Sequence, residues 1–212
     1  MKKNNSVYLI LSETNTGVGL AIRLLTNFHF NHSSLALSDD LDELYSFGRL
    51  RKSPFLVGGF IVEKPSRYLA KHLDINIRVY KLDLPAKEYK ILKQRVDYYL
   101  ANKNETVYNC FSAVCTLFNK RINAKDAFTC CEFVQSLLGY DGVSTIKGLT
   151  ELYEQQLIYQ GSYRNYLGLT STAFVAPDQD YEERSPLLTS LGNTYTHIHT
   201  LLDRVVDARN HP

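Results

Sequence analysis

The pattern of apolar and polar positions divides the chain into an early part rich in strands and a later part rich in helices. Residues 77–84 (IRVYKLDL) alternate apolar and polar side chains, which is typical of a strand with one buried face. Short apolar runs bounded by polar or turn-forming residues predict further strands at 7–12, 32–37, 43–47 and 55–63. Gly58 and Gly59 in the last run predict a bulge or the close approach of another backbone.

Apolar residues at helical spacing predict helices in much of the remaining chain. Residues 86–101 place Tyr89, Leu92, Val96 and Tyr99 on one stripe of an amphipathic helix. Further helices are expected at 17–27, 108–118, 130–138, 148–156 and 187–207, the last as a terminal helix or a loosely attached tail. Because the strands come first and do not alternate regularly with the helices, we expect an α+β fold with an antiparallel sheet packed against helices.

A polar stretch near the C-terminus interrupts this pattern. Residues 177–186 (PDQDYEERSP) are typical of a linker or loop. We therefore expect one domain over residues 1–175, followed by a linker and a C-terminal helix or tail over residues 176–212.

Composition narrows the class of protein. The chain has 212 residues, a net charge of +2 and 44% hydrophobic residues, as expected for a soluble globular domain without a nucleic-acid partner. No apolar run approaches the length of a membrane-spanning helix, and the five apolar residues 7–11 are too few for a secretory signal. Four cysteines, two of them adjacent, do not form a disulfide framework. These features indicate a cytoplasmic protein with reduced thiols.

The most specific local signal is the start of the helix at 130. Thr129 can cap this helix, Glu132 can complete a capping box with it, and Gly139 can end it. The flanking residues Phe128 and Phe133 can form a hydrophobic staple. Cys130 is then the first helical residue, where unpaired N–H groups and the helix dipole favour a thiolate.

A thiol in this position has two interpretations. It is either a structural cysteine that packs as a small apolar side chain, or a nucleophile paired with a histidine. His32, on an early predicted strand, is the candidate base that would take the thiol proton. The pair could then attack a carbonyl carbon, with the backbone N–H of Cys130 as one donor to the oxyanion.

Several segments together resemble the permuted papain-like amidases. These YiiX-type proteins are relatives of the NlpC-type cell-wall peptidases and of lecithin retinol acyltransferase. The segments are His32–Leu37 (HSSLAL), Leu44–Arg49 (LYSFGR), Gly58–Phe60 with Glu63, and Thr129–Val134 (TCCEFV). The first three resemble the histidine strand and following hairpin of a bacterial subgroup, and the fourth resembles the start of the cysteine helix. The resemblance covers residues 7–140 in the order of their elements.

The resemblance implies a permuted papain-like, NlpC-type fold in which Cys130 is the nucleophile and His32 the base. Cys131 stands where the family usually has serine, so either thiol remains a candidate nucleophile. A third, orienting residue is expected on the strand after that of His32, which offers Tyr45 and Ser46, and Glu63 is a later candidate. The implied enzyme is a cysteine hydrolase, of peptidase or amidase type, that cleaves an amide, peptide or acyl ester bond through a thioester. The thiol and imidazole suffice for this chemistry, so we expect no cofactor and no metal.

Other interpretations compete with this one. The chain could be a catalytically inactive binding or scaffold module of the same fold, with residues 181–212 as the interaction element. Residues 7–11 and 16–21 also resemble the first strand and glycine-rich turn of an NAD(P)-binding oxidoreductase, although the first glycine is missing. The four cysteines could in principle bind zinc, but adjacent helical cysteines diverge by about 100°.

Overall fold

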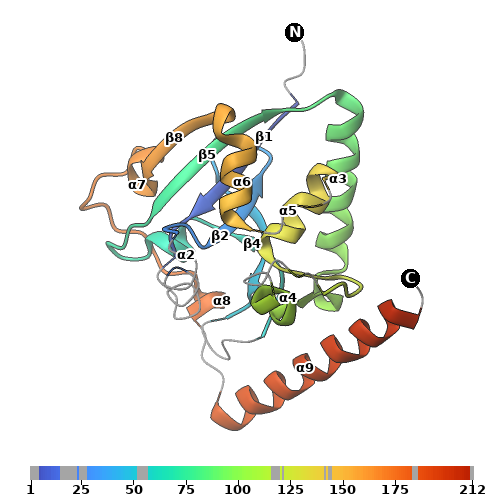
Figure 1. The fold of residues 1–212 in the computed structure, drawn as a ribbon. Helices are drawn as coiled ribbons and strands as arrows, with labels where there is room; N and C mark the ends of the chain where they lie inside the picture. Colours follow the sequence, from blue (N-terminus) through green and yellow to red (C-terminus); the bar gives the residue numbers. More distant parts are fainter. Residues whose placement is uncertain are drawn as a thin grey trace.

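The computed structural model of the chain describes residues 5–14, 23, 28–51, 57–115, 120, 122–140, 142, 145–182 and 186–210. Its main sheet has the strand order β4-β3-β2-β1-β5-β8, and all neighbouring strands are antiparallel (Figure 1). The strands are β1 (Ser6–Ser12), β2 (His32–Ala36), β3 (Leu44–Arg49), β4 (Gly58–Glu63), β5 (Asn76–Asp83) and β8 (Leu157–Ser162). The expected α+β fold with an antiparallel sheet is confirmed.

Helices cover both faces of this sheet, and the longer ones follow the first five strands in sequence. They are α2 (Ser66–Leu69), α3 (Ala86–Ala101), α4 (Cys110–Cys115), α5 (Cys130–Leu138), α6 (Ile146–Tyr153), α7 (Tyr163–Tyr166), α8 (Gln179–Glu182) and α9 (Leu187–Asn210). Short 3-10 helices span Lys103–Glu105 and Glu154–Gln156. The expected helix at 17–27 lies outside the described residues, apart from Arg23.

An aromatic cluster joins α3 and α5 to the sheet. The ring of Phe47 on β3 lies 4.8 Å from that of Phe133 on α5 and 5.8 Å from that of Tyr99 on α3. The ring of Phe60 on β4 lies 5.6 Å from Phe133. Successive side chains of a strand point to opposite faces, so Phe47 and Phe60 face the helices while their neighbours along the strand face away. This alternation decides which strand residues can reach His32.

Two parts of the sheet system were not predicted. Strand β8 is half-exposed at the edge of the sheet, where it pairs with β5, so it lacks a strong apolar pattern. A second, two-stranded sheet pairs β6 (Val107–Tyr108) in parallel with β7 (Ala127–Phe128). The segment expected to be helical from residue 108 therefore begins as a strand, and helix α4 starts at Cys110. These pairings are long-range and leave no periodic signal in so few residues.

The C-terminal helix α9 packs along β6 and β7. His197 Nε2 donates to the carbonyl of Tyr108 at 3.1 Å, and Leu201 is completely buried. Arg204 donates to the carbonyls of Lys125, Asp126 and Glu105. The expected helix is therefore present, and buried contacts hold it. In the described part of the chain, no helix is long and apolar enough to cross a membrane.

Candidate active site

The start of α5 forms the capping box that the sequence predicts. The N–H of Glu132 donates to Thr129 Oγ1 at 3.2 Å, and the N–H of Thr129 donates to Glu132 Oε2 at 2.7 Å. Gly139 ends the helix with φ of 74°. The rings of Phe128 and Phe133 lie 6.4 Å apart, which forms the predicted staple. Cys130 and Cys131 therefore occupy the first turn, whose N–H groups have no partner within the helix.

A neighbouring helix fixes the same turn from outside. The hydroxyl of Ser112 on α4 donates to Glu132 Oε1, while Glu132 Oε2 serves the cap. Ser112 and Glu132 are both buried. One oxygen of this carboxylate thus joins α4 to α5 and the other completes the cap of α5, so Glu132 supports the position of the thiol.

His32, the first residue of β2, lies at one end of the sheet. Its Nε2 is 3.0 Å from Glu63 Oε2 and 3.3 Å from Ser46 Oγ. The Ser46 hydroxyl donates to the carbonyl of Ser33 at 2.7 Å, so its oxygen is free to accept from the imidazole. The structure therefore brings both candidate orienting residues, Ser46 and Glu63, to the same ring nitrogen. Nδ1 remains the ring nitrogen available to the thiol.

Glu63 is deeply buried and bears a negative charge that its neighbours stabilise. Its Oε1 lies 3.4 Å from Arg67 Nε on α2, and only 2% of its side chain is exposed. Burial alone would raise the pKa of Glu63, but the charge and hydrogen bond of His32, then Arg67 and a hydrogen bond from Tyr68, bring it below its ordinary value. A permanent carboxylate therefore faces the imidazole.

The two partners of His32 together favour its charged form. Burial would lower the pKa of His32, but the Glu63 carboxylate and a hydrogen bond with the Cys130 thiolate raise it to about 10. Only 13% of the His32 side chain is exposed. At neutral pH the imidazole is therefore an imidazolium held between a carboxylate and a thiolate.

The structure distinguishes the two adjacent thiols. A hydrogen bond from Cys131 lowers the pKa of Cys130, burial opposes this, and His32 together with the backbone of Ser33 lowers it further, to well below the ordinary value. The pKa of Cys131 is raised well above the ordinary value by that same hydrogen bond and by burial. The Ser33 hydroxyl donates to Cys131 Sγ at 3.7 Å. These opposite directions favour Cys130 as the thiolate and Cys131 as the protonated thiol beside it.

Glycines allow the strands to approach closely beside the site. A Cβ atom on Gly59 would lie 2.9 Å from the carbonyl oxygen of Thr106, and one on Gly58 would lie 2.5 Å from that of Gly48. The predicted close approach of another backbone at these paired glycines is confirmed. A Cβ on Gly48 would lie 3.5 Å from Cε1 of His32, an ordinary van der Waals distance, so Gly48 lies directly beside the imidazole.

Tyr108 is a candidate functional residue that sequence reasoning missed. Burial raises the pKa of its phenol well above the ordinary value, and the nearby negative charges of Cys130 and Glu132 add to this. Its hydroxyl therefore stays protonated at neutral pH and keeps its capacity to donate a hydrogen bond. The sequence shows only a tyrosine before a short apolar run, because the parallel β6–β7 pairing alone places it beside α5.

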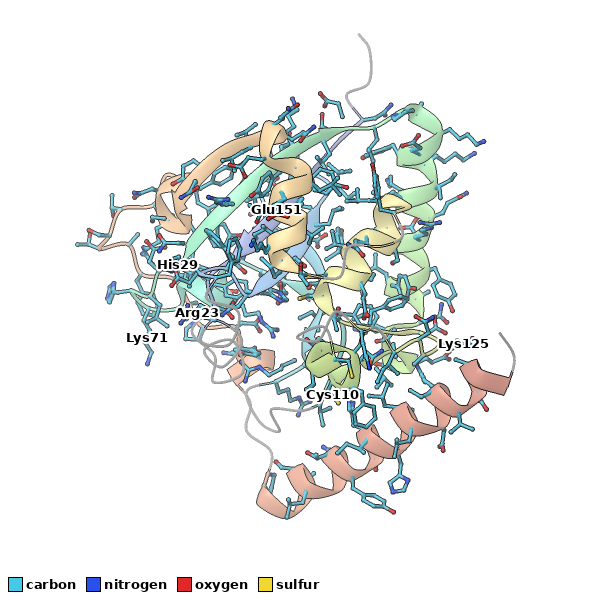
Figure 2. The ribbon with its side chains drawn as sticks, in the orientation of Figure 1. Arg23, His29, Lys71, Cys110, Lys125 and Glu151 are labelled. Carbon is cyan, nitrogen blue, oxygen red and sulfur yellow. The ribbon has the colours of Figure 1, made fainter. Side chains whose placement is uncertain are left out.

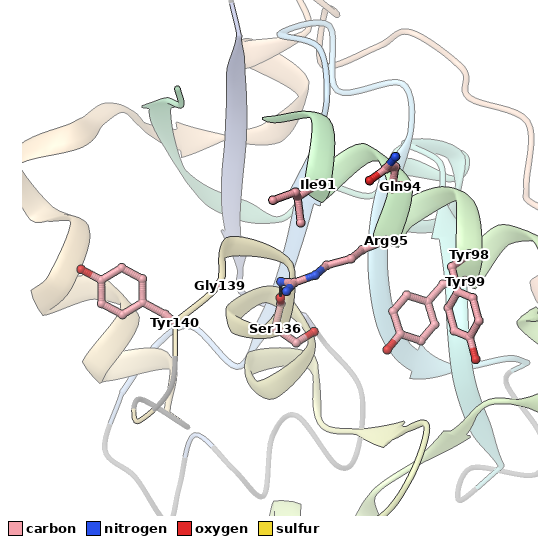
Figure 3. Close-up of a pocket in the computed structure, with 8 residues that line it drawn as sticks. All are labelled: Ile91, Gln94, Arg95, Tyr98, Tyr99, Ser136, Gly139 and Tyr140. Carbon is pink, nitrogen blue, oxygen red and sulfur yellow. Dashed lines mark hydrogen bonds between the residues drawn. The ribbon is translucent and has the colours of Figure 1, made fainter. Parts of the chain in front are cut away.

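Residues outside the site take no part in this arrangement. His29, on the segment before β2, is exposed (Figure 2), and His197 binds a backbone carbonyl. A groove between α3 and the end of α5 is lined by Ile91, Gln94, Arg95, Tyr98, Tyr99, Ser136, Gly139 and Tyr140 (Figure 3). It lies at the opposite end of α5 from Cys130, where Arg95 donates to the carbonyl of Ser136.

The geometry of the described residues supports neither a dinucleotide-binding site nor a zinc site. Strand β1 lies between two antiparallel neighbours, unlike the parallel strands of a dinucleotide-binding sheet, and the glycine-rich turn at 16–21 lies outside the described residues. All four cysteines are free. Within the described ranges, no group of three or more histidine, cysteine or acidic residues could hold a metal ion.

No family model, no curated protein and no solved structure matches this chain.

Proposed function

We propose that this protein is a cysteine hydrolase that cleaves an amide, peptide or acyl ester bond through a thioester intermediate. The observation that carries the proposal is the position of His32: its Nε2 lies 3.0 Å from Glu63 Oε2, and its strand contacts the start of α5 through the Ser33–Cys131 hydrogen bond. The opposite charges of His32 and the Cys130 thiolate stabilise each other there. This is the relation of nucleophile, base and orienting acid that acyl transfer requires.

The arrangement supports a two-step reaction. The Cys130 thiolate attacks the substrate carbonyl carbon, and the resulting oxyanion accepts hydrogen bonds from the N–H groups of the first turn of α5 and from the Tyr108 hydroxyl. The His32 imidazolium gives its proton to the departing nitrogen or oxygen, which leaves a thioester on Cys130. Neutral His32 then takes a proton from water, and the hydroxide attacks the thioester. Collapse of this second intermediate releases the carboxylic acid product and restores the thiolate–imidazolium pair.

We also propose that the fold is a circularly permuted papain-like fold. In papain-like proteases the nucleophilic cysteine precedes the histidine in sequence. Here the histidine strand comes first and the cysteine helix follows almost 100 residues later, yet the two meet at the end of the sheet. This reversed order within one antiparallel sheet favours a permutation. Stem peptides of peptidoglycan, isopeptides and lipid esters all remain substrate classes for this site.

Alkylation by iodoacetamide tests the proposal directly. The low pKa of Cys130 and the pKa of about 10 for His32 imply that the ion pair persists across neutral pH. We expect the labelling rate of Cys130 to be high and constant from about pH 7 to 9, whereas an ordinary thiol gains reactivity through about pH 8.5. Mass spectrometry identifies the labelled residue, and Cys115 or Cys110, both half-buried, serves as the internal reference. A labelling rate of Cys130 that rises through pH 8.5 would contradict the proposal.

A further inference from the structure

The C-terminal segment reaches the same site from the side opposite the thiol. Its short helix α8 places Tyr181 against α2, where Arg67 lies (Figure 1). The guanidinium carbon of Arg67 is 3.9 Å from the centre of the Tyr181 ring. Tyr181 is itself buried, with 7% of its surface exposed. A cation stacked on an aromatic ring at this distance, away from water, is held strongly.

Arg67 connects this stack to the imidazole through Glu63. One carboxylate oxygen of Glu63 faces Arg67 Nε at 3.4 Å, and the other faces His32 Nε2 at 3.0 Å. A carboxylate is planar and turns as one unit, so the guanidinium that holds one oxygen also sets the position of the other. These contacts therefore form one continuous series in space, from Tyr181 through Arg67 and Glu63 to His32, although the four residues come from four elements.

A second arginine fixes the tyrosine ring. Arg49, at the end of β3, donates to the Tyr181 hydroxyl at 2.6 Å, and Arg67 donates to the carbonyl of Arg49. The ring is thus held by its hydroxyl while its face remains against Arg67. The charged and titratable groups around Glu63 are His32 from β2, Arg67 and Tyr68 from α2, Arg49 from β3, Tyr163 from α7 and Tyr181 from α8.

We infer that Tyr181 is a positioning residue for the Cys130–His32–Glu63 site and acts through the guanidinium of Arg67. This inference rests on the proposed hydrolase function and adds α8 to the catalytic apparatus. Without the aromatic face, water and alternative conformers compete for Arg67, and Glu63 loses the contact that orients it. The imidazolium is then less stabilised, and the thiolate loses part of its counter-charge. The C-terminal segment thus contributes to the reactivity of a thiol that lies on another face of the sheet.

Substitutions at Tyr181 separate the aromatic face from the hydroxyl. Tyr181→Phe keeps the ring and should leave the pH midpoint of Cys130 alkylation within about 0.3 units of the wild type. Tyr181→Leu and Tyr181→Met remove the ring and should raise that midpoint by about one unit, which is a tenfold loss of thiolate at low pH. Tyr195→Leu is the matched control, because Tyr195 lies on α9 and is 66% exposed. It should behave as the wild type.

A coupling measurement tests the route through Arg67. In an Arg67→Gln background, Tyr181→Leu should cause no further change in the alkylation midpoint, because the cation it stabilises is gone. An undiminished effect in that background would overturn the inference, and so would a wild-type midpoint in both Tyr181→Leu and Tyr181→Met. Thermal unfolding of each variant identifies any that fail to fold, and Tyr181→Met then replaces Tyr181→Leu. An unshifted Cys130 midpoint in the wild type would instead refute the proposed function, so the two failures are distinguishable.

Discussion

Two buried glutamates lie in this site. Glu132 supports the thiol half, which is the start of α5 with Cys130, and Glu63 supports the imidazole half, which is His32 with its partners. Glu132 accepts from the N–H of Thr129, three residues before it, and from the hydroxyl of Ser112. Glu63 accepts from His32, which is 31 residues away in sequence, and pairs with Arg67. Glu132 therefore binds neutral donors and fixes a helix start, whereas Glu63 binds charged partners and fixes an imidazole.

The comparison shows that similar burial does not imply a similar role. Both side chains are almost completely inaccessible, with 1% exposure for Glu63 and 2% for Glu132. What differs is the charge of their partners. A carboxylate that faces cations can alter the charge state of a catalytic base, while one that faces N–H and O–H groups contributes mainly to stability. The following substitutions test these different roles of Glu63 and Glu132, beginning with the Cys130 thiol that both glutamates support.

Replacing the nucleophile should have the largest effect. We expect Cys130→Ala to abolish formation of an acyl-enzyme and to reduce turnover by at least about 10³-fold, because the neighbouring Cys131 thiol has a raised pKa and stays protonated. Cys131→Ala should retain acyl-enzyme formation at a lower rate, since it removes only a donor to the thiolate. Intact-protein mass spectrometry after incubation with an activated ester measures both. Loss of the adduct in Cys131→Ala, with retention in Cys130→Ala, would reverse the assignment of the two thiols.

The two glutamates themselves provide the next largest difference. Glu63→Gln removes the negative charge that faces His32, so the pKa of His32 should fall toward 6.5 and turnover should fall by about 10²- to 10⁴-fold. Glu132→Gln is the matched control, because glutamine can still complete a capping box. It should leave the alkylation profile of Cys130 unchanged. If Glu132→Gln shifted that profile as much as Glu63→Gln, the proposed division of roles would be wrong.

Loss of the helix cap should affect stability more than reactivity. Thr129→Ala removes the acceptor for the Glu132 N–H, and we expect the free energy of unfolding to fall by about 1 kcal/mol. Thr129→Ser keeps the acceptor and should be close to the wild type. Urea unfolding followed by circular dichroism measures both variants. A loss below about 0.3 kcal/mol for Thr129→Ala would mean that the cap is not a stabilising element here.

The smallest effect is expected at Ser46. Its hydroxyl bridges the Ser33 carbonyl and His32 Nε2, but Glu63 is the closer and charged partner of that nitrogen. Ser46→Ala should therefore lower turnover by less than about tenfold, which corresponds to one ordinary hydrogen bond. Steady-state rates with Ser46→Thr as the hydroxyl-retaining variant measure this. A loss as large as that of Glu63→Gln would make Ser46 the principal orienting residue.

The sequence predicts the thiol half of the site in detail. The helix from Cys130 to Leu138, its capping box and its glycine end are all confirmed, because each depends on residues only three or four positions apart. The first five strands and the helices α3, α5, α6 and α9 also follow from local alternation and helical spacing, whereas β6, β7 and β8 do not. The sequence named Ser46 and Glu63 as candidate partners of His32 but gave no physical reason to choose between them.

Only the tertiary structure decided the imidazole half and its support. Pairing of β3 with β4 sets Leu44 opposite Glu63 and Ser46 opposite Ile61, and this register brings Glu63 and Ser46 to the same ring nitrogen. The β6–β7 pair, the edge strand β8 and the stack of Tyr181 on Arg67 were likewise invisible in the sequence. Local hydrogen bonds are fixed by chain geometry within one turn, so they can be read from neighbouring residues. Contacts between distant strands depend on how the whole chain buries its apolar surface, and no short segment contains that information.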